Sequence, residues 1–225
     1  MSVLVFSCGR TGTNMLLEIL RGAPELQATP FVEDKQVFHR AELPSNYLSK
    51  CDTVYLPQLE MADRLLTLNP DLKVLWTIRD LRDTALSKIY RGQPNGDSPN
   101  LSDDATYEGC LEDIEWMHKV YTFLQERHPT QLLVVKMEDI ILKFDETIQG
   151  VCTFCEIEYR EEMKNFTHRY RNSHKATRYK TLDPSQVALH ERVDTVYEGF
   201  FTTHDIDLES LFANLEKYQK EFGYQ

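Results

Sequence analysis

The sequence predicts an α/β fold in three layers, with a central, mainly parallel sheet between flanking helices. Three short apolar segments predict its strands: Val3–Phe6, Lys73–Ile78 and Gln131–Lys136. Each is a short, mainly apolar run rather than an alternating pattern, which is typical of strands that are covered on both faces. A weaker fourth strand is predicted at Thr53–Leu56. Because helical patterns lie between the strands, we expect right-handed crossover connections.

Five segments carry apolar residues at helical spacing. They are Asn14–Leu20, Met61–Leu68, Asp83–Tyr90, Tyr107–Gln125 and Leu208–Phe222. Residues Gly92–Asp104 are rich in turn formers and have no apolar period, which predicts a loop. Since no repeat or linker divides the chain, residues 1–225 are interpreted as one domain.

Composition narrows the class of protein. No segment approaches the ~18 consecutive apolar residues of a membrane span, and no basic stretch followed by an apolar one marks a secretory signal. We therefore expect a cytoplasmic protein. The five scattered cysteines predict reduced thiols rather than a disulfide framework. Cys152 and Cys155 have the spacing of a redox or zinc pair, but their apolar neighbours favour two buried thiols on a helix.

The distribution of charge is uneven. A net charge of −11 disfavours binding to nucleic acid or to anionic membranes. The stretch Met163–Leu182 nevertheless contains no acidic residue and carries several basic ones, among them Arg178 and Lys180. Such a segment in an acidic protein indicates a small anionic ligand. The alternative is a solvated loop whose charges pair with carboxylates elsewhere in the chain.

The first predicted strand leads into a glycine-containing turn and then a helix, the arrangement with which α/β proteins bind anions. Gly9 and Gly12 allow the backbone N–H groups to point inward, while Arg10 adds a permanent positive charge. Short polar donors complete the turn: Thr11, Thr13 and Asn14. The Gly-Lys-Ser/Thr ending of a nucleoside triphosphate loop is missing. A simple chain reversal with an exposed arginine is the alternative.

A second anion corner is predicted where the strand Lys73–Ile78 ends. Arg79 follows the strand directly, and Ser87 lies on the next helix, so a tight turn would bring both to one phosphate. Asp80 and Asp83 are placed to cap that helix or to hold Arg79 and Arg82. An ordinary capped helix with surface arginines is the alternative.

These motifs together resemble the sulfotransferases that use 3′-phosphoadenosine-5′-phosphosulfate (PAPS), whose fold is similar to that of P-loop nucleoside triphosphatases. "CGRTGTNMLLEIL" resembles their 5′-phosphosulfate loop, and "LWTIRDLRDTALSKIYR" resembles their 3′-phosphate element. "LLVVKMEDI", "ATRYKTLDPSQVALHERV" and the final "FGY" are similar to later segments of the family, in the same order. The resemblance spans nearly the whole chain.

The resemblance implies in-line transfer of a sulfuryl group from PAPS to the hydroxyl, or an amine, of a small-molecule acceptor, without a metal. Arg10 would stabilise charge on the leaving group, and Thr13 would contact the 5′-phosphate. Arg79 and Ser87 would bind the 3′-phosphate that distinguishes PAPS from ATP. Arg178 and Lys180 are expected over the nucleotide phosphates.

The proton acceptor departs from the common pattern of the family. Many cytosolic members have a His after the second strand with a Lys before it, and "DTVYLPQLEMADR" contains neither. Other members use a Glu after the first helix, where this chain has Glu33. Glu33 is therefore the expected base, with Asp34 and His39 in reserve, and a surface carboxylate as the alternative.

Two other functions compete with this interpretation. A P-loop kinase-like phosphotransferase shares the fold, but it would need a Lys at the end of the first turn. A non-catalytic nucleotide-binding relative is compatible with the missing His and Lys. Small alcohols, phenols, sugars and lipid head groups all stay open as acceptors, whereas the scarcity of other basic clusters disfavours a long sulfated polysaccharide.

Overall fold

The computed structural model describes residues 1–29, 33–92, 107–166 and 208–224. Its centre is a five-stranded sheet in the order β2-β3-β1-β4-β5, and every pairing in it is parallel. The strands are β1 (Ser2–Ser7), β2 (Gln27–Ala28), β3 (Tyr47–Asp52), β4 (Leu72–Ile78) and β5 (Leu132–Lys136). The predicted parallel α/β sheet is thus confirmed.

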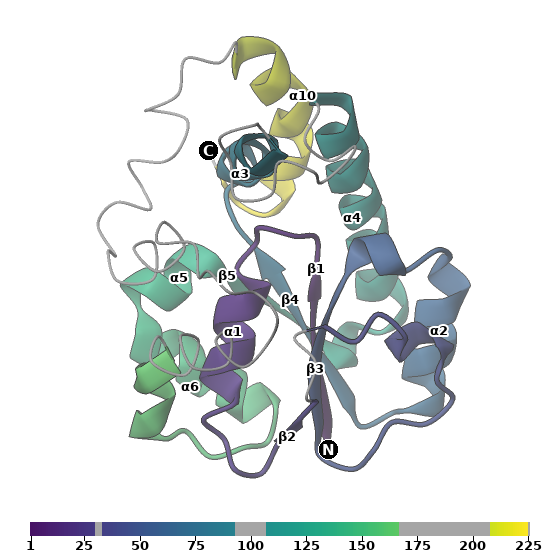
Figure 1. The fold of residues 1–225 in the computed structure, drawn as a ribbon, viewed down its shortest axis with the longest axis vertical. Helices are drawn as coiled ribbons and strands as arrows, with labels where there is room; N and C mark the ends of the chain where they lie inside the picture. The colour runs from purple at the N-terminus through teal and green to yellow at the C-terminus, as the bar shows by residue number, and fades with distance from the viewer. Residues whose placement is uncertain (30–32, 93–106, 167–207, 225) are drawn as a thin grey trace.

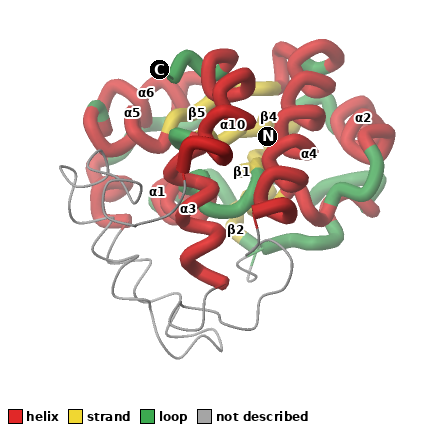
Figure 2. Tube along the Cα trace, turned by 90° about the horizontal axis from the view of Figure 1, so that it is seen from above, coloured by secondary structure: helices red, strands yellow, loops and turns green. Residues whose placement is uncertain are grey.

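Helices cover both faces of the sheet. Figure 1 shows α1 (Thr13–Leu20), α5 (Met137–Leu142) and α6 (Phe144–Phe154) on one face, and α2 (Leu59–Leu68) and α4 (Tyr107–Arg127) on the other. Seen from above in Figure 2, α10 (Leu208–Glu221) packs beside α3 (Leu81–Gly92) and α4. Short 3-10 turns complete the described elements: η1 (Val37–His39), η2 (Thr53–Tyr55), η4 (Pro129–Gln131) and η5 (Glu161–Asn165).

Each face of β1 contributes to a different core. Val3 and Val5 pack with residues of α1, α5 and α6, whereas Leu4 and Phe6 pack with residues of α2, α4 and α10. Because successive strand residues point to opposite faces, a strand buried on both sides is nearly continuously apolar. Trp76 of β4 is fully buried and meets Phe6 edge to face, with ring centroids 5.3 Å apart.

The prediction of a strand at Thr53–Leu56 is wrong. The strand lies just before it, at Tyr47–Asp52, and residues Thr53–Tyr55 form a 3-10 turn instead. Asp52 starts this turn by accepting a hydrogen bond from the Val54 N–H at 3.3 Å. The polar residues Ser49 and Lys50 conceal the real strand in the sequence, although Ser49 is buried.

All five cysteines are free and buried. Cys152 lies near the end of α6 and Cys155 follows this helix directly, so the predicted pair of buried thiols is confirmed. The loop predicted at Gly92–Asp104 lies outside the described residues except for Gly92 itself. Most of the basic stretch Met163–Leu182 also lies outside them. Within the described residues, no helix is long and apolar enough to cross a membrane.

Candidate active site

The two predicted anion corners meet at one edge of the sheet. β1 and β4 are adjacent and parallel, so their carboxyl ends lie side by side. The turn Cys8–Gly12 follows β1, and Arg79 follows β4, immediately before α1 and α3 begin. All strands run upward in Figure 1, toward α3. Ligands of doubly wound sheets bind at this edge.

The turn after β1 has the backbone of an anion-binding loop. Arg10 and Gly12 adopt left-handed conformations, with φ of 74° and 93°. Gly12 caps α1 without a side-chain hydrogen bond, and the first turn of this fully described helix contains no acidic residue. The positive end of the helix dipole is therefore left to an external anion.

Thr11 holds the turn in place instead of facing a ligand. Its hydroxyl donates to the Cys8 carbonyl at 2.8 Å and lies 2.9 Å from the Thr77 hydroxyl of β4. Since Thr11 is fully buried and its hydroxyl is engaged, this side chain is not available to an anion. The sequence predicted a side-chain donor here; the structure places this hydroxyl against the sheet.

Replacing Gly12 with alanine is expected to destabilise the protein by about 1–3 kcal/mol. An alanine would keep the left-handed φ of 93°, and its Cβ would lie 3.1 Å from Met137 Cγ. The matched control is Gly150→Ala in α6, where a Cβ meets nothing within 4 Å. Removing a glycine from a helix interior should stabilise by about 0.5–1 kcal/mol. Urea denaturation of both variants measures the difference, and equal midpoints would contradict the assignment of strain to Gly12.

The corner after β4 buries a guanidinium group. Arg79 is 2% exposed, and its Nη2 lies 3.1 Å from Asp83 Oδ2 on the first turn of α3. Burial raises the pKa of Asp83, against the opposing effect of the Arg79 charge. Arg82 pairs in a similar way with Asp80, so both acidic residues hold arginines, as the sequence suggested.

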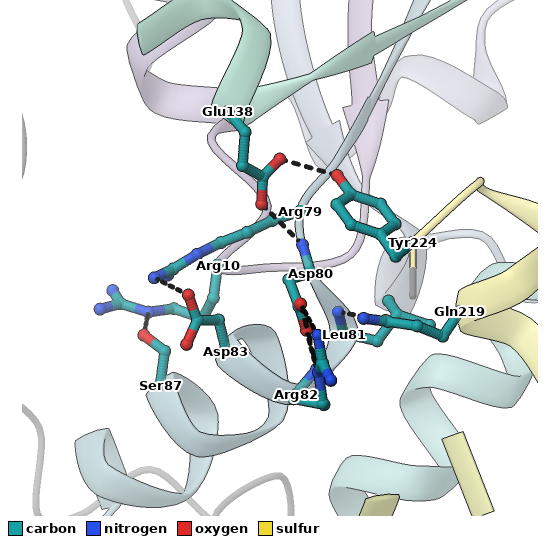
Figure 3. Close-up of polar contacts among 10 residues, drawn as sticks. All are labelled: Arg10, Arg79, Asp80, Leu81, Arg82, Asp83, Ser87, Glu138, Gln219 and Tyr224. Carbon is teal, nitrogen blue, oxygen red and sulfur yellow. Dashed lines mark hydrogen bonds and ion pairs between the residues drawn. The ribbon is translucent and has the colours of Figure 1, made fainter. Parts of the chain in front are cut away.

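Arg10 reaches across to this second corner. Its Nε donates to the hydroxyl of Ser87, a buried residue of α3, at 2.7 Å. Figure 3 shows the Arg10 and Arg79 side chains directed to the same place, beside Asp83 and Ser87. Several buried polar atoms nearby have no hydrogen-bond partner among the described residues: Asn14 Oδ1, Arg79 Nε, Asp83 Oδ1 and Thr84 Oγ1. The two guanidinium groups, with Arg79 Nε and the Thr84 hydroxyl as donors, suit an anionic ligand.

The C-terminal segment braces the same corner. Glu138 Oε1 accepts from the Asp80 N–H at 2.8 Å, and its Oε2 accepts from the Tyr224 hydroxyl at 2.7 Å. Gln219 Oε1 accepts from the Leu81 N–H at 2.8 Å. These contacts satisfy backbone donors at the start of α3 (Figure 3). Nothing in the sequence pattern identifies Gln219, because its partner lies far away along the chain.

The three residues predicted as proton acceptors lie between β2 and β3. Glu33 pairs with Lys50 of β3 at 3.2 Å. Asp34 is buried and engages the Tyr47 hydroxyl at 2.8 Å and Arg40 at 2.9 Å. His39 is exposed at the end of η1. Arg178 and Lys180 lie outside the described residues.

A third group of charges was missed by sequence reasoning. Lys88, next to Ser87 on α3, is almost fully buried and forms an ion pair with Asp113 of α4. Asp52, at the end of β3, interacts electrostatically with both. The three come from separate elements, so no spacing in the sequence reveals them. In the described part of the chain, no three His, Cys, Asp or Glu side chains are grouped to hold a metal ion.

Comparison with known proteins decides the family, because a family model described as "Sulfotransferase domain" matches residues 1–199. The chain belongs to the sulfotransferase family. No curated protein sequence matches it. Among solved structures, this sulfotransferase resembles the sulfotransferase domain of the curacin biosynthetic pathway, with a TM-score of 0.66 and 13% identity over 99% of this chain and 97% of that one.

Two further structures share the fold of this sulfotransferase. The sulfotransferase domain of the Synechococcus PCC 7002 olefin synthase has a TM-score of 0.67 and 13% identity, over 100% of this chain and 95% of that one. Mouse sulfotransferase SULT7A1, complexed with PAP, has a TM-score of 0.62 and 16% identity, over 98% and 87% of the two chains. At such low identities the similarity establishes the fold alone.

Proposed function

We propose that this enzyme transfers the sulfuryl group of PAPS to a hydroxyl or amine of a small-molecule acceptor by in-line displacement. The observation that carries the proposal is that the turn after β1 and the buried Arg79 after β4 lie at neighbouring strand ends, where Arg10 of the first corner reaches Ser87 of the second. Two cationic corners suit a ligand with an anionic group at each end of an adenosine. The mouse relative with bound PAP supports this choice of donor.

The residues at this edge divide into two binding groups. Arg79 and Ser87 would hold the 3′-phosphate. Gly9, Arg10, Gly12, Thr13 and Asn14, with the backbone of Thr11, would hold the 5′-phosphosulfate at the start of α1. The buried Nε of Arg79, which has no partner among the described residues, fits a group that supplies oxygen acceptors. Arg178 and Lys180 are proposed to close over the nucleotide.

PAPS supplies a sulfur centre with a good leaving group, so the protein has to position the two reactants and to neutralise the charge on the leaving group. In this arrangement the guanidinium of Arg10 and the N–H groups at the start of α1 would stabilise the negative charge that develops on the leaving phosphate. Removing one such donor typically lowers kcat by about 10²–10³. Because these groups provide positive charge, we propose that transfer proceeds without a metal.

An acceptor hydroxyl also has to lose its proton. We propose a carboxylate at this edge of the sheet as the acceptor of that proton. Glu33 is the residue that the sequence predicts, with Asp34 and His39 in reserve. The five free, buried cysteines support a cytoplasmic location, where thiols stay reduced.

Thermal unfolding with nucleotides tests the proposal. 3′,5′-Adenosine bisphosphate (PAP) and PAPS should raise the melting temperature more than AMP or ATP do, because only the first two carry the 3′-phosphate. An equal response to AMP would contradict it. A second assay with PAPS and a panel of phenols, alcohols, sugars and amines separates an enzyme from a non-catalytic nucleotide-binding relative, which would bind PAP without transferring sulfate.

A further inference from the structure

We infer that Asp52 is the catalytic base of this sulfotransferase and receives the proton of the acceptor hydroxyl on its Oδ2 atom. The inference rests on the proposed function and assigns one of its steps. It differs from the expectation for Glu33, and it arises from contacts that the sequence does not reveal.

Asp52 lies beside the anion-binding turn. It is the last residue of β3 and pairs in register with Ser7, the last residue of β1, so the turn begins next to it. A Cβ placed on Gly9 would lie 3.0 Å from Asp52 Oδ2 and 3.8 Å from Lys88 Nζ. The absence of a side chain at Gly9 therefore lets the carboxylate approach the loop that would hold the phosphosulfate.

The two oxygens of Asp52 have different surroundings. Oδ1 accepts from the Val54 N–H at 3.3 Å and lies 3.5 Å from the Thr53 hydroxyl, which fixes the carboxylate. Oδ2 is the oxygen that faces Gly9. The residue is partly exposed, so an acceptor can reach it. Asp34, by contrast, is buried with both oxygens engaged.

The charges around Asp52 adjust its proton affinity. The pKa of Asp52 is raised to about 6, chiefly by burial; Asp113 of α4 and Glu33 also raise it, whereas Lys88 of α3 lowers it. The buried Cys8 thiol, just before Gly9, also faces this group, with a pKa raised by burial. A base with a pKa near neutrality combines adequate strength with the deprotonated form at working pH.

Lys88 is a positioning residue in this arrangement. Burial alone would lower its pKa, but interaction with the Asp113 and Asp52 carboxylates opposes that effect, and the pKa is raised. The ammonium group is held by Asp113 and stays charged. Its positive charge therefore offsets the repulsion between the Asp52 and Asp113 carboxylates and keeps Asp52 ionised at neutral pH.

The step balances without any further reactant. The acceptor oxygen forms a bond to sulfur while the bond from sulfur to the bridging oxygen breaks. The electron pair of that bond stays on the phosphate of the leaving PAP. The acceptor proton moves to Asp52 Oδ2 and is later released to solvent.

Hydrolysis of ³⁵S-labelled PAPS, with water as acceptor, measures this step before any natural acceptor is known. In the wild type, the rate should rise with pH and level off above about pH 6, because the base must be ionised. Asp52→Asn should lower the rate by about 10²-fold or more and remove the dependence on pH near 6. PAP binding, measured by calorimetry, should change little, since the nucleotide phosphates are assigned to Arg79, Ser87 and the turn after β1 rather than to Asp52.

Three further variants make the test specific. Asp113→Asn removes a charge that raises the pKa of Asp52, so the rising limb should move to lower pH. Glu33→Gln should lower the rate of PAPS hydrolysis less than Asp52→Asn does. Asp63→Asn, on a surface pair with Arg127, is the matched control for an Asp-to-Asn change and should keep the wild-type profile.

The outcomes separate the two proposals. A larger loss in Glu33→Gln, with the rising limb kept in Asp52→Asn, would overturn the assignment of Asp52 and leave the proposed function standing. A wild type that binds PAP but turns over no PAPS would likewise overturn it. A wild type that does not bind PAP would remove the proposed function itself.

Discussion

Replacing Arg79 with alanine is expected to abolish the stabilisation of this protein by PAP while leaving any response to AMP unchanged. The guanidinium is buried in the corner after β4, where it would meet the 3′-phosphate in a dry environment. Truncating one partner of a buried charge pair costs about 2–5 kcal/mol, so the dissociation constant of PAP should rise by roughly 30-fold to 1000-fold or more. Isothermal calorimetry measures the change.

Two control variants distinguish a loss of PAP binding from a loss of folding. Arg79→Ala leaves Asp83 buried without its ion-pair partner, so the double variant Arg79→Ala/Asp83→Asn should recover stability but not PAP binding. Arg82→Ala removes an arginine three positions along, whose partner is Asp80, and should keep the response to PAP. Undiminished PAP binding in Arg79→Ala would remove the main support for the donor.

Replacing Lys88 with methionine should produce the largest loss of stability. The change preserves length but leaves Asp52 and Asp113 facing each other without the cation between them. Removing one partner of a buried ion pair typically costs about 3–5 kcal/mol. Urea denaturation at pH 8 measures the loss, and Lys220→Met, on a surface pair with Glu216, is the matched control that should change little.

The loss in Lys88→Met should depend on pH. The pKa of Asp52 is about 6 in the folded protein and close to its ordinary value of roughly 4 when unfolded. The folded state therefore binds the proton more tightly, and stability falls as pH rises through this window. Without Lys88 the pKa of Asp52 rises further, so the variant should regain stability between pH 8 and pH 5. A loss that is equal at both pH values would contradict the coupling of Lys88 to Asp52.

Strands with both faces buried were the part of the fold most accessible from sequence. Val3–Phe6 is apolar at every position and Lys73–Ile78 at most of them, because alternate side chains meet different helical layers. β3 escaped detection since Ser49 and Lys50 satisfy their polar groups inside the fold, with Thr29 and Glu33 as partners. Local composition could not reveal those partners.

The residues of the candidate site also differ in how far local sequence could predict them. Arg10 and Arg79 follow strand ends closely, so short motifs were enough to predict the two corners, whereas the contact between Arg10 and Ser87 was not predicted. Asp52, Lys88 and Asp113 meet only because β3, α3 and α4 pack against one another. A contact of that kind depends on tertiary packing and leaves no local spacing in the sequence.

The brace formed by Gln219 and Tyr224 has a consequence for biosynthesis. Gln219 accepts a hydrogen bond from the Leu81 N–H, and Tyr224 supports Glu138, which accepts from the Asp80 N–H. Residues 79–81 therefore emerge from the ribosome long before the two side chains that secure them. A nascent chain can therefore assemble most of its sheet but cannot lock the β4–α3 junction until translation has passed position 224. Ribosome-stalled chains ending before Gln219 should accordingly fail to bind PAP.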